Sequence, residues 1–319
     1  MLDWKSVVSI DIGSSLIKIA QLSRSSGKVR LERVGIIENP IPNFRSAMDG
    51  AGETAIVRII KRGLRMSRIR ARDVVSSLSG PSIIVQYFKL PLVSGKELEN
   101  AVYLEAQRVM SRKIGEMEIG FQVLPSQQSQ RRTQEVIFAA APKTMIHQRM
   151  DTLKRAGLNP ITIDIDCLAL ANCFLKLNPP VSDQGVLVLN LGAELINLVI
   201  LSHNSLEFIR DISLGLKAPL NLTRENIFSK MIEEIRRSIN YHEARSGGRK
   251  VTRVFLTGGK TVASNIDKLL QDNLELPVER WNPLKSLEFN WEKRGARLEE
   301  NQGYLLAITV GLGLREKEE

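Results

Sequence analysis

The sequence is poor in the residue types that build metal centres, disulfide frameworks and aromatic binding platforms. Among its 319 residues are two cysteines and three histidines, and only 5% of the residues are aromatic. Cys167 and Cys173 lie in one apolar segment without further ligands, and the histidines are far apart in the sequence. This pattern argues against a zinc site and against a disulfide scaffold, and it predicts a reducing compartment.

Long apolar runs are also missing. The most apolar stretch, residues 186–201, is interrupted by Asn190, Glu194 and Asn197, so no run approaches the roughly 20 residues of a bilayer span. The N-terminal sequence MLDWKSVVSIDIG carries charges where a signal peptide has its apolar core. We therefore expect a soluble, cytoplasmic protein.

Acidic residues are outnumbered by basic ones. Lysine and arginine total 45 against 35 acids, which gives a net charge of +10. The basic residues are spread over several stretches, and none of these is interleaved with aromatic residues: 58–72, 108–113, 131–132 and 236–250. The charge permits contact with anionic lipid or nucleic acid. We interpret it mainly as solvated surface and expect no specific nucleic-acid binding.

The stretch 7–20, VVSIDIGSSLIKIA, has the pattern of a β-hairpin. Apolar residues alternate on both sides of a polar turn, in which Gly13 supplies backbone freedom and Ser14 and Ser15 form the exposed tip. Two interpretations fit. The stretch is a plain hairpin, or its turn holds phosphate oxygens by backbone N–H groups while Asp11 orients metal-bound water and Lys18 stands just beyond.

A second stretch repeats this pattern. Residues 185–201, GVLVLNLGAELINLVIL, again indicate a strand, a glycine-centred turn and a second strand, and residues 205–212 add a third. Asn190 stands 179 positions after Asp11. The repeat predicts two related domains that face one another across a cleft.

Two glycines, Gly258 and Gly259, follow a predicted strand that ends at Thr257. A diglycine at the carboxyl end of a strand allows close approach by a flat ligand or by a packed helix, and the sequence leaves both open.

Periodicity sets the expected domain organisation. Apolar residues at helical spacing predict helices over 51–66 and 224–241. A further helix is predicted over 166–177, where Asn178, Pro179 and Pro180 end it, and strands are expected between these helices. We predict a first domain over residues 1–165, with a small α/β insertion at about 92–159. The second domain spans residues 166–319, and its C-terminal helix, 302–314, returns to the first domain.

Several short motifs carry a family resemblance. DIGSS near the N-terminus, LNLGA in the middle and TGG after a long helix occur in the order of the actin-like ATPases. Closer still, four segments resemble the type IV pilus assembly protein PilM family: SGPSIIVQYFKLP at 79–91, IDIDCLAL at 163–170, RDIS at 210–213 and EEIRRS at 233–238. The resemblance implies an α/β fold of two ribonuclease-H-like domains with a small insertion subdomain similar to that of FtsA.

The resemblance also implies ATP with magnesium in the cleft. By matching position, the first phosphate loop comprises Asp11, which would also serve the metal, with Gly13, Ser14, Ser15 and Lys18. The second loop comprises Asn190, Gly192 and Ala193, and the adenosine would face Glu233, Arg236, Gly258 and Gly259.

For partners, the resemblance implies the short cytoplasmic tail of the inner-membrane protein PilN and other components of the pilus machine. The protein would be peripheral to the inner membrane only through this partner. The tail would lie near 83–90 and 97–107, with Tyr87 and Phe88 as contacts. The predicted function is a scaffold of a type IV pilus or of a related secretion or competence machine.

The second loop departs from the family pattern. Asn190 stands where an aspartate is usual, residues 194–196 replace hydroxyl side chains, and Gly215 is not followed by a second glycine in a shortened segment. An amide cannot supply the charge that orients magnesium-bound water, so the ATP site is predicted to be degenerate. The alternative is an active ATPase or a small-molecule kinase, for which Asp164 or Asp166 would be the catalytic acid.

Overall fold

The chain divides into two compact units in a computed structural model. The large unit comprises Met1–Leu78 with Arg149–Glu319, and the small unit comprises Ser79–Gln148. The small unit thus begins and ends earlier than the predicted insertion at about 92–159, and the predicted domain boundary at residue 165 stays a prediction. The described residues are 6–25, 28–41, 51–124, 132–214, 224–259, 261, 265–288 and 298–315.

The first sheet of the large unit has the strand order β3-β2-β1-β4-β8. Strands β1 to β3 are antiparallel neighbours, and β4 and β8 continue the sheet in parallel. Their bounds are β1 (Val7–Ile12), β2 (Leu16–Ser25), β3 (Lys28–Glu38), β4 (Asp73–Leu78) and β8 (Asn159–Ile165).

The second sheet repeats this topology with the order β11-β10-β9-β12-β13. Three antiparallel strands again lead into two parallel ones, so the internal repeat in the sequence corresponds to a repeat of the fold. The bounds are β9 (Gly185–Leu191), β10 (Ile196–Ser202), β11 (Ser205–Ile212), β12 (Val251–Thr257) and β13 (Val278–Arg280). The sequence pattern did not indicate β13, which has only three residues.

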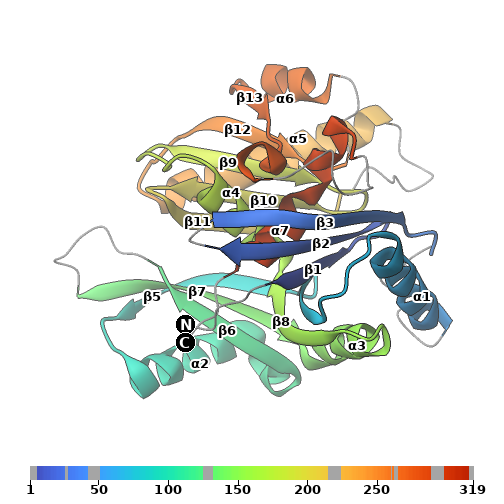
Figure 1. Ribbon diagram of the computed structural model, residues 1–319. Helices are drawn as coiled ribbons and strands as arrows, with labels where there is room; N and C mark the ends of the chain where they lie inside the picture. The colour runs from blue at the N-terminus through green and yellow to red at the C-terminus, as the bar shows by residue number, and fades with distance from the viewer. Residues whose placement is uncertain are drawn as a thin grey trace. The chain divides into compact units, whose positions relative to one another are not determined.

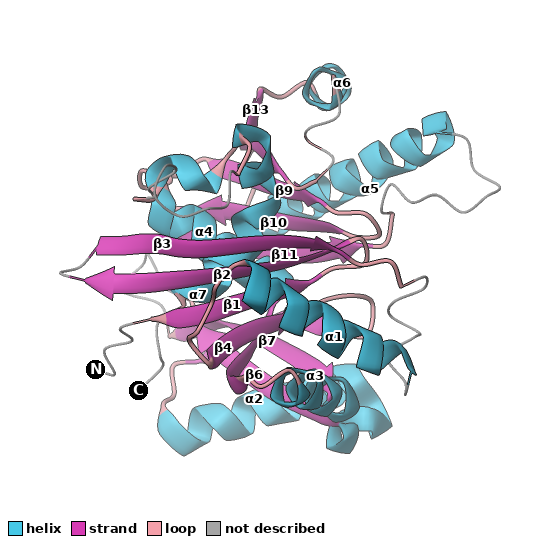
Figure 2. Ribbon diagram, turned by 45° about the vertical axis from the view of Figure 1, so that its right-hand side comes forward, coloured by secondary structure: helices cyan, strands magenta, loops and turns pink. Residues whose placement is uncertain are grey.

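Helices cover both faces of the first sheet (Figure 1). On one face, α1 (Ala51–Met66) and the end of α3 (Lys143–Arg155) complete a core of isoleucine and valine side chains from β1, β2 and β4. On the other face, α7 (Ala307–Leu314) contacts β1 and β2. Figure 2 shows α1 lying along the outer side of this sheet.

A pair of helices joins the two sheets. Helix α4 (Asp166–Leu177) contacts β9, β10 and β11 of the second sheet and packs along α7 of the first. The two helices approach closely because α7 carries Gly311, where a Cβ atom would overlap the backbone of Ala169. A Cβ atom at Gly313 would overlap Leu22 of β2, so this second glycine lets α7 pack on the first sheet. The pair α4–α7 is therefore the shared layer of the large unit.

The remaining elements of the large unit flank the second sheet. Helix α5 (Arg224–Arg245) contacts β11 and α6 (Ile266–Leu274). Two 3₁₀ helices, η2 (Pro283–Ser286) and η3 (Glu300–Leu306), contact one another, and η3 runs into α7. The helix predicted over 302–314 is thus a 3₁₀ turn followed by a short α-helix. None of the described helices combines the length and the apolar character needed to cross a bilayer.

The small unit is a three-stranded antiparallel sheet of order β5-β7-β6 with helix α2 on one face. Buried α2 residues Leu98, Val102, Ala106 and Met110 pack on the sheet around Phe138. The bounds are β5 (Ile84–Pro91), α2 (Gly95–Met110), η1 (Ser111–Glu116), β6 (Met117–Val123) and β7 (Thr133–Pro142).

Candidate functional site

The predicted first phosphate loop is the turn between β1 and β2. The amide of Gly13 donates to the carbonyl of Leu16 at 3.0 Å, which closes the turn. Asn39, just after β3, lies against this turn. Its backbone N–H donates to the carbonyl of Ser15 at 2.8 Å, and its side-chain Nδ2 donates to the carbonyl of Gly13 at 2.9 Å. Ser14 is buried, which corrects the expected exposed tip, and Ser15 is half-buried.

Asp11 and Lys18 are paired across this hairpin. They are register partners on β1 and β2, and Lys18 Nζ donates to Asp11 Oδ2 at 2.5 Å. The side chains are only 6% and 16% exposed, respectively. The carboxylate assigned to the metal is therefore neutralised within its own hairpin.

The turn between β9 and β10 has the same backbone closure. The amide of Gly192 donates to the carbonyl of Leu195 at 3.0 Å. Asn190 and Asn197 occupy the register positions that Asp11 and Lys18 occupy in the first hairpin, and Asn190 Nδ2 donates to Asn197 Oδ1 at 2.7 Å. Ala193 lies in the turn and is half-buried. The second hairpin thus carries a neutral pair in place of an ion pair.

The polar residues at this register of the second hairpin continue onto the next strand of the sheet. Asn197 is also the register partner of Asp211 on β11, and its Nδ2 donates to Asp211 Oδ1 at 2.7 Å. The corresponding partner of Lys18 on β3 is Ile36. The second sheet therefore carries its carboxylate on β11, two strands away from Asn190 on β9.

Cys167 on α4 is the last member of this chain of hydrogen-bonded side chains. Its Sγ donates to Asp211 Oδ1 at 3.2 Å. Burial, followed by the negative charge of Asp211, raises the pKa of the Cys167 thiol well above its ordinary value, and burial also raises that of Cys173. Both thiols stay protonated near neutral pH. Among the described residues no cluster of histidine, cysteine or acidic side chains could hold a metal ion.

Gly258 lies directly against the second turn. It follows β12, whose last residue Thr257 is the register partner of Asn190, and it has φ of +101°. A Cβ atom there would lie 2.5 Å from the amide nitrogen of Leu191. Gly259, in contrast, faces Leu305 of η3, where a Cβ atom would be 3.0 Å from that side chain. The structure therefore accounts for both glycines by close packing.

The two α5 residues assigned to the adenosine have other partners. Glu233 accepts from Arg237 at 3.2 Å, and both side chains are exposed. Arg236 donates to the backbone carbonyl of Asn273 in the last turn of α6, where a cation complements the helix dipole.

The carboxylates of the alternative kinase hypothesis are also paired. Asp164 forms an ion pair with Arg315 at 2.7 Å, and Asp166 accepts from Ser77 Oγ at 2.5 Å. Both contacts link β8 and the start of α4 to neighbouring segments of the large unit. The shortened segment after Gly215 lies outside the described residues.

The partner residues of the small unit separate onto the two faces of β5. Phe88 belongs to the core beneath α2 and stacks on Phe138 with ring centroids 5.2 Å apart. Tyr87 is half-buried and points to the opposite face, because successive strand side chains alternate. Only Tyr87 stands outside the core that α2 covers.

One pocket of the large unit was not foreseen from the sequence. It has a volume of about 580 Å³ and is lined by Gln21, Glu32, Arg33, Arg68 and Arg70. Its residues come from β2, β3 and the segment after α1. The sequence showed a run of basic residues there, but no local pattern joins that run to β2 and β3.

Solved structures with the same topology define the class. The chain matches a protein of the "PilM-PilN type IV pilus biogenesis complex" with a TM-score of 0.84 and 24% identity, over 97% of each chain. It also matches the ethanolamine utilization protein EutJ from Carboxydothermus hydrogenoformans (TM-score 0.51, 11% identity, 97% and 89% covered). A Bacteroides thetaiotaomicron protein described as having an actin-like ATPase fold gives a TM-score of 0.50 at 8% identity, with 89% and 95% covered. The predicted α/β fold of actin-like ATPases is confirmed.

The particular family follows from the sequence match. The family model for the type IV pilus assembly protein PilM matches residues 9–225 and 223–317. The chain belongs to this family, which confirms the resemblance found in the sequence.

Proposed function

We propose that this protein is a cytoplasmic docking component of a type IV pilus machine and binds the cytoplasmic tail of a PilN-like inner-membrane protein. Membership of the PilM family carries the proposal. The most similar fold reported above comes from a PilM–PilN complex, which supports a partner of the same kind. The protein would then be peripheral to the inner membrane, held there by its partner.

We place the tail contact on β5 of the small unit, on the sheet face opposite α2. Tyr87 lies half-buried on that face, outside the core that α2 covers. A partly exposed tyrosine of this kind commonly anchors a peptide. The exposed Tyr103 and Leu104 on the outer side of α2 face away from Tyr87, so we leave them out of the contact. Phe88 supports the segment from inside.

The test is tail binding measured by isothermal titration with a synthetic peptide of the organism's own PilN-like tail. We expect Tyr87→Ala to weaken binding at least tenfold while lowering the melting temperature less than Phe88→Ala does, because Tyr87 is only half-buried. Phe88→Ala should lower the melting temperature, because it empties part of the core. Tyr241→Ala, which removes a tyrosine 57% exposed on α5, is the matched control. Equal binding by wild type and Tyr87→Ala would move the contact elsewhere.

The nucleotide site is attenuated in this proposal. The glycine turns at Gly13 and Gly192 suit phosphate oxygens, but the donor set does not suit magnesium. Asp11 is neutralised by Lys18 at 2.5 Å, and Asn190 is a neutral amide held by Asn197 at 2.7 Å. Magnesium prefers carboxylate oxygens, and neither hairpin offers an unpaired one beside its turn. We therefore assign the protein no hydrolytic step.

A carboxylate introduced at residue 190 of the second hairpin tests whether the magnesium site is absent. We expect ATP to shift the melting temperature of the wild type equally with and without magnesium. Asn190→Asp should introduce a magnesium-dependent shift, whereas Asn190→Ala should not. For scale, ATP at one hundred times its dissociation constant stabilises by about 2.7 kcal/mol. Steady phosphate release that Asp11→Ala abolishes would instead favour the ATPase alternative.

A further inference from the structure

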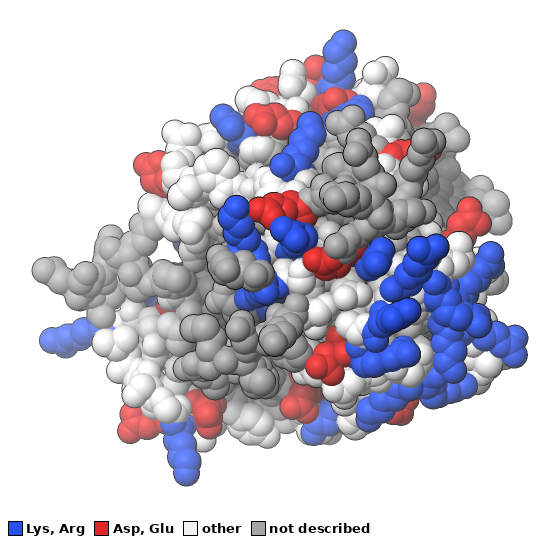
Figure 3. Space-filling view, viewed as in Figure 1, with Lys and Arg blue, Asp and Glu red and all other residues white. Residues whose placement is uncertain are grey.

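The outer face of α1 carries a stripe of cations. Its inner residues, such as Ile56, Ile60 and Leu64, are buried in the core, whereas the outer side chains are basic and exposed. The sequence from 54 to 72 contains no acid. The exposed cations of this run are Arg58, Lys61, Arg62, Arg65, Arg68, Arg70 and Arg72. Lys and Arg side chains gather at the lower right of Figure 3, where Figure 1 draws α1.

Among the residues that the structure describes, no acidic side chain forms an ion pair with these cations. Four of them, Arg58, Lys61, Arg62 and Arg65, are spaced three or four residues apart, so they repel one another along the helix. The one acid of α1, Glu53, pairs with Arg155 at 2.7 Å. Repulsion among these like charges lowers the stability of the helix, so a contribution to folding does not explain why the cations are there.

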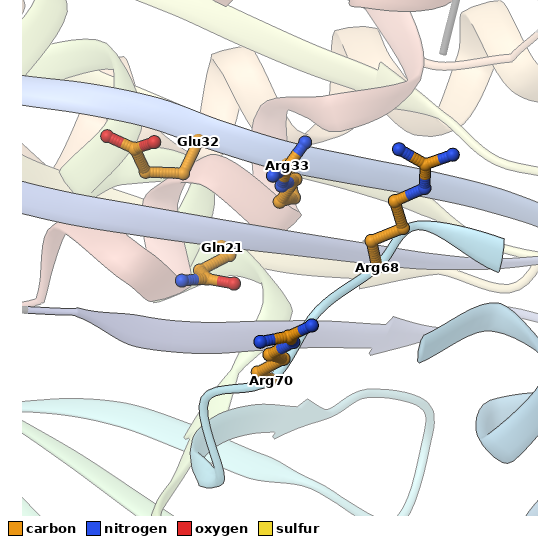
Figure 4. A pocket seen from close by; sticks show the side chains of 5 residues that line it. All are labelled: Gln21, Glu32, Arg33, Arg68 and Arg70. Atoms are coloured by element: carbon orange, nitrogen blue, oxygen red, sulfur yellow. The ribbon is translucent and has the colours of Figure 1, made fainter. Parts of the chain in front are cut away.

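The basic stripe of α1 is continuous with the pocket that Arg33, Arg68 and Arg70 line, here called the arginine pocket. Helix α1 ends in a Schellman motif: the amide of Ile69 donates to the carbonyl of Leu64 at 2.9 Å, and that of Arg68 to the carbonyl of Arg65 at 3.0 Å. This turn brings Arg68 and Arg70 beside Arg33 and Gln21 of the sheet. In Figure 4 the three arginines lie on one side of the pocket, and the carboxylate of Glu32 lies at the other end. Glu32 accepts from Ser23 at 2.8 Å.

Arg68 occupies a position that suits glycine better. It has φ of +54°, the left-handed conformation that a Schellman motif requires of the first residue beyond the helix cap. A side chain is strained in that conformation, and glycine is not. An arginine at this position therefore adds strain to the fold while adding a charge to the pocket.

We propose that this basic face, the α1 stripe with the arginine pocket, binds the anionic phospholipid headgroups of a membrane leaflet. Its charge is complementary to such a surface, and clustered lysine and arginine side chains bind anionic lipid additively. Met66, 67% exposed at the end of α1, offers an apolar side chain among the cations. No aromatic residue lies between 51 and 72, so bases of single-stranded nucleic acid would find no stacking partner. The choice of a membrane over nucleic acid rests in part on the proposed inner-membrane partner.

Lipid binding is tested with the full chain alone by co-sedimentation with phosphatidylcholine vesicles that contain about 30% phosphatidylglycerol. We expect binding that pure phosphatidylcholine does not support and that added salt weakens. The triple variant Lys61→Gln/Arg62→Gln/Arg65→Gln should bind roughly a hundredfold more weakly, since each cation near an anionic surface contributes about fivefold. Its melting temperature should not fall, because repulsion along α1 is relieved.

The matched control removes three exposed cations of the second half, Lys230→Gln/Lys268→Gln/Lys285→Gln. It lowers the net charge equally and should leave vesicle binding unchanged. An equal loss in both triple variants would overturn the proposal, because net charge alone would then explain binding. Binding to duplex DNA without binding to vesicles would also overturn it, as would full competition by millimolar inorganic phosphate. None of these outcomes affects tail-peptide binding, so the proposed function is judged separately.

Arg68→Gly separates binding from stability within the pocket. The variant should raise the melting temperature by about 2 °C, because glycine relieves the left-handed strain. It should also weaken vesicle binding by about fivefold. Unchanged vesicle binding would remove the pocket from the lipid-binding face.

Discussion

The two hairpins of the large unit share a backbone design and differ in their charges. In each, a glycine amide closes the turn on the carbonyl of a leucine at 3.0 Å, and a polar pair bridges the strands at the same register. The first pair is Asp11 with Lys18, and the second is Asn190 with Asn197. The backbone of a duplicated element is thus retained while its electrostatics diverge, and a carboxylate reappears two strands away at Asp211.

The largest expected effect comes from breaking the ion pair of the first hairpin. Lys18→Met would leave the carboxylate of Asp11 buried and uncompensated, and we expect a loss of about 3 kcal/mol in the free energy of unfolding. Urea denaturation measures it. The double variant Asp11→Asn/Lys18→Asn copies the pair of the second hairpin and should recover most of the loss. If Lys18→Met costs under about 1 kcal/mol, the pair is more hydrated than its burial indicates.

Alanine at the turn glycines should give an intermediate effect that differs between the halves. A Cβ atom would lie 2.5 Å from the carbonyl oxygen of Leu195 at Gly192, but 2.9 Å from that of Leu16 at Gly13. We expect Gly192→Ala to cost about 2 kcal/mol and Gly13→Ala about 1 kcal/mol, because overpacking costs roughly 1–3 kcal/mol. Thermal denaturation of both variants measures which of the two loses more stability. A larger loss for Gly13→Ala than for Gly192→Ala would contradict the Cβ distances given above.

The smallest expected effect is a pH dependence in the second half. Glu207 on β11 lies 2.5 Å from Arg249 and 3.4 Å from His242. Partial burial opposes ionisation, but the hydrogen bond with His242 and the charge of Arg249 outweigh it and hold the pKa of Glu207 below its ordinary value. A lowered carboxyl pKa stabilises the folded protein above about pH 4.3, and this contribution is lost as the pH falls through the folded pKa.

The matching measurement follows unfolding by urea from pH 6 to pH 3.5. Wild type should lose up to roughly 1 kcal/mol more than Glu207→Gln over this range. Parallel curves for the two proteins would mean that the ion pair adds nothing to folding.

Local patterns in the sequence were sufficient where a segment is periodic and has clear ends. Helices over 51–66 and 166–177 were predicted with the observed bounds. The first has regular apolar spacing, and the second ends at the break formed by Asn178, Pro179 and Pro180. The repeated hairpin was visible for the same reason. Strand β13 was missed, since three residues carry too little pattern.

The site was less predictable because its contacts depend on register and on the tertiary fold. The sequence located Gly13 and Gly192 in turns, but the pairing of Asp11 with Lys18 requires the register of β1 and β2. Asn39 was not considered, although it closes over the first turn, because it is distant in sequence. The pocket at Arg33 and Arg68 combines residues of β2, of β3 and of the segment after α1, which are distant in sequence. The absence of acids over 54–72 was the one signal that could have directed attention to it.

The close packing of α7, which Gly311 and Gly313 allow, has a consequence for biosynthesis. The helix lies against β1 and β2, which leave the ribosome long before it, and against α4 through Gly311. Until α7 has been translated, one side of the N-terminal strands exposes apolar surface such as Leu22 to chaperones or to other nascent chains. Assembly of this layer is therefore expected after most of the chain has emerged, and a truncated product lacking α7 would be a substrate for protein quality control.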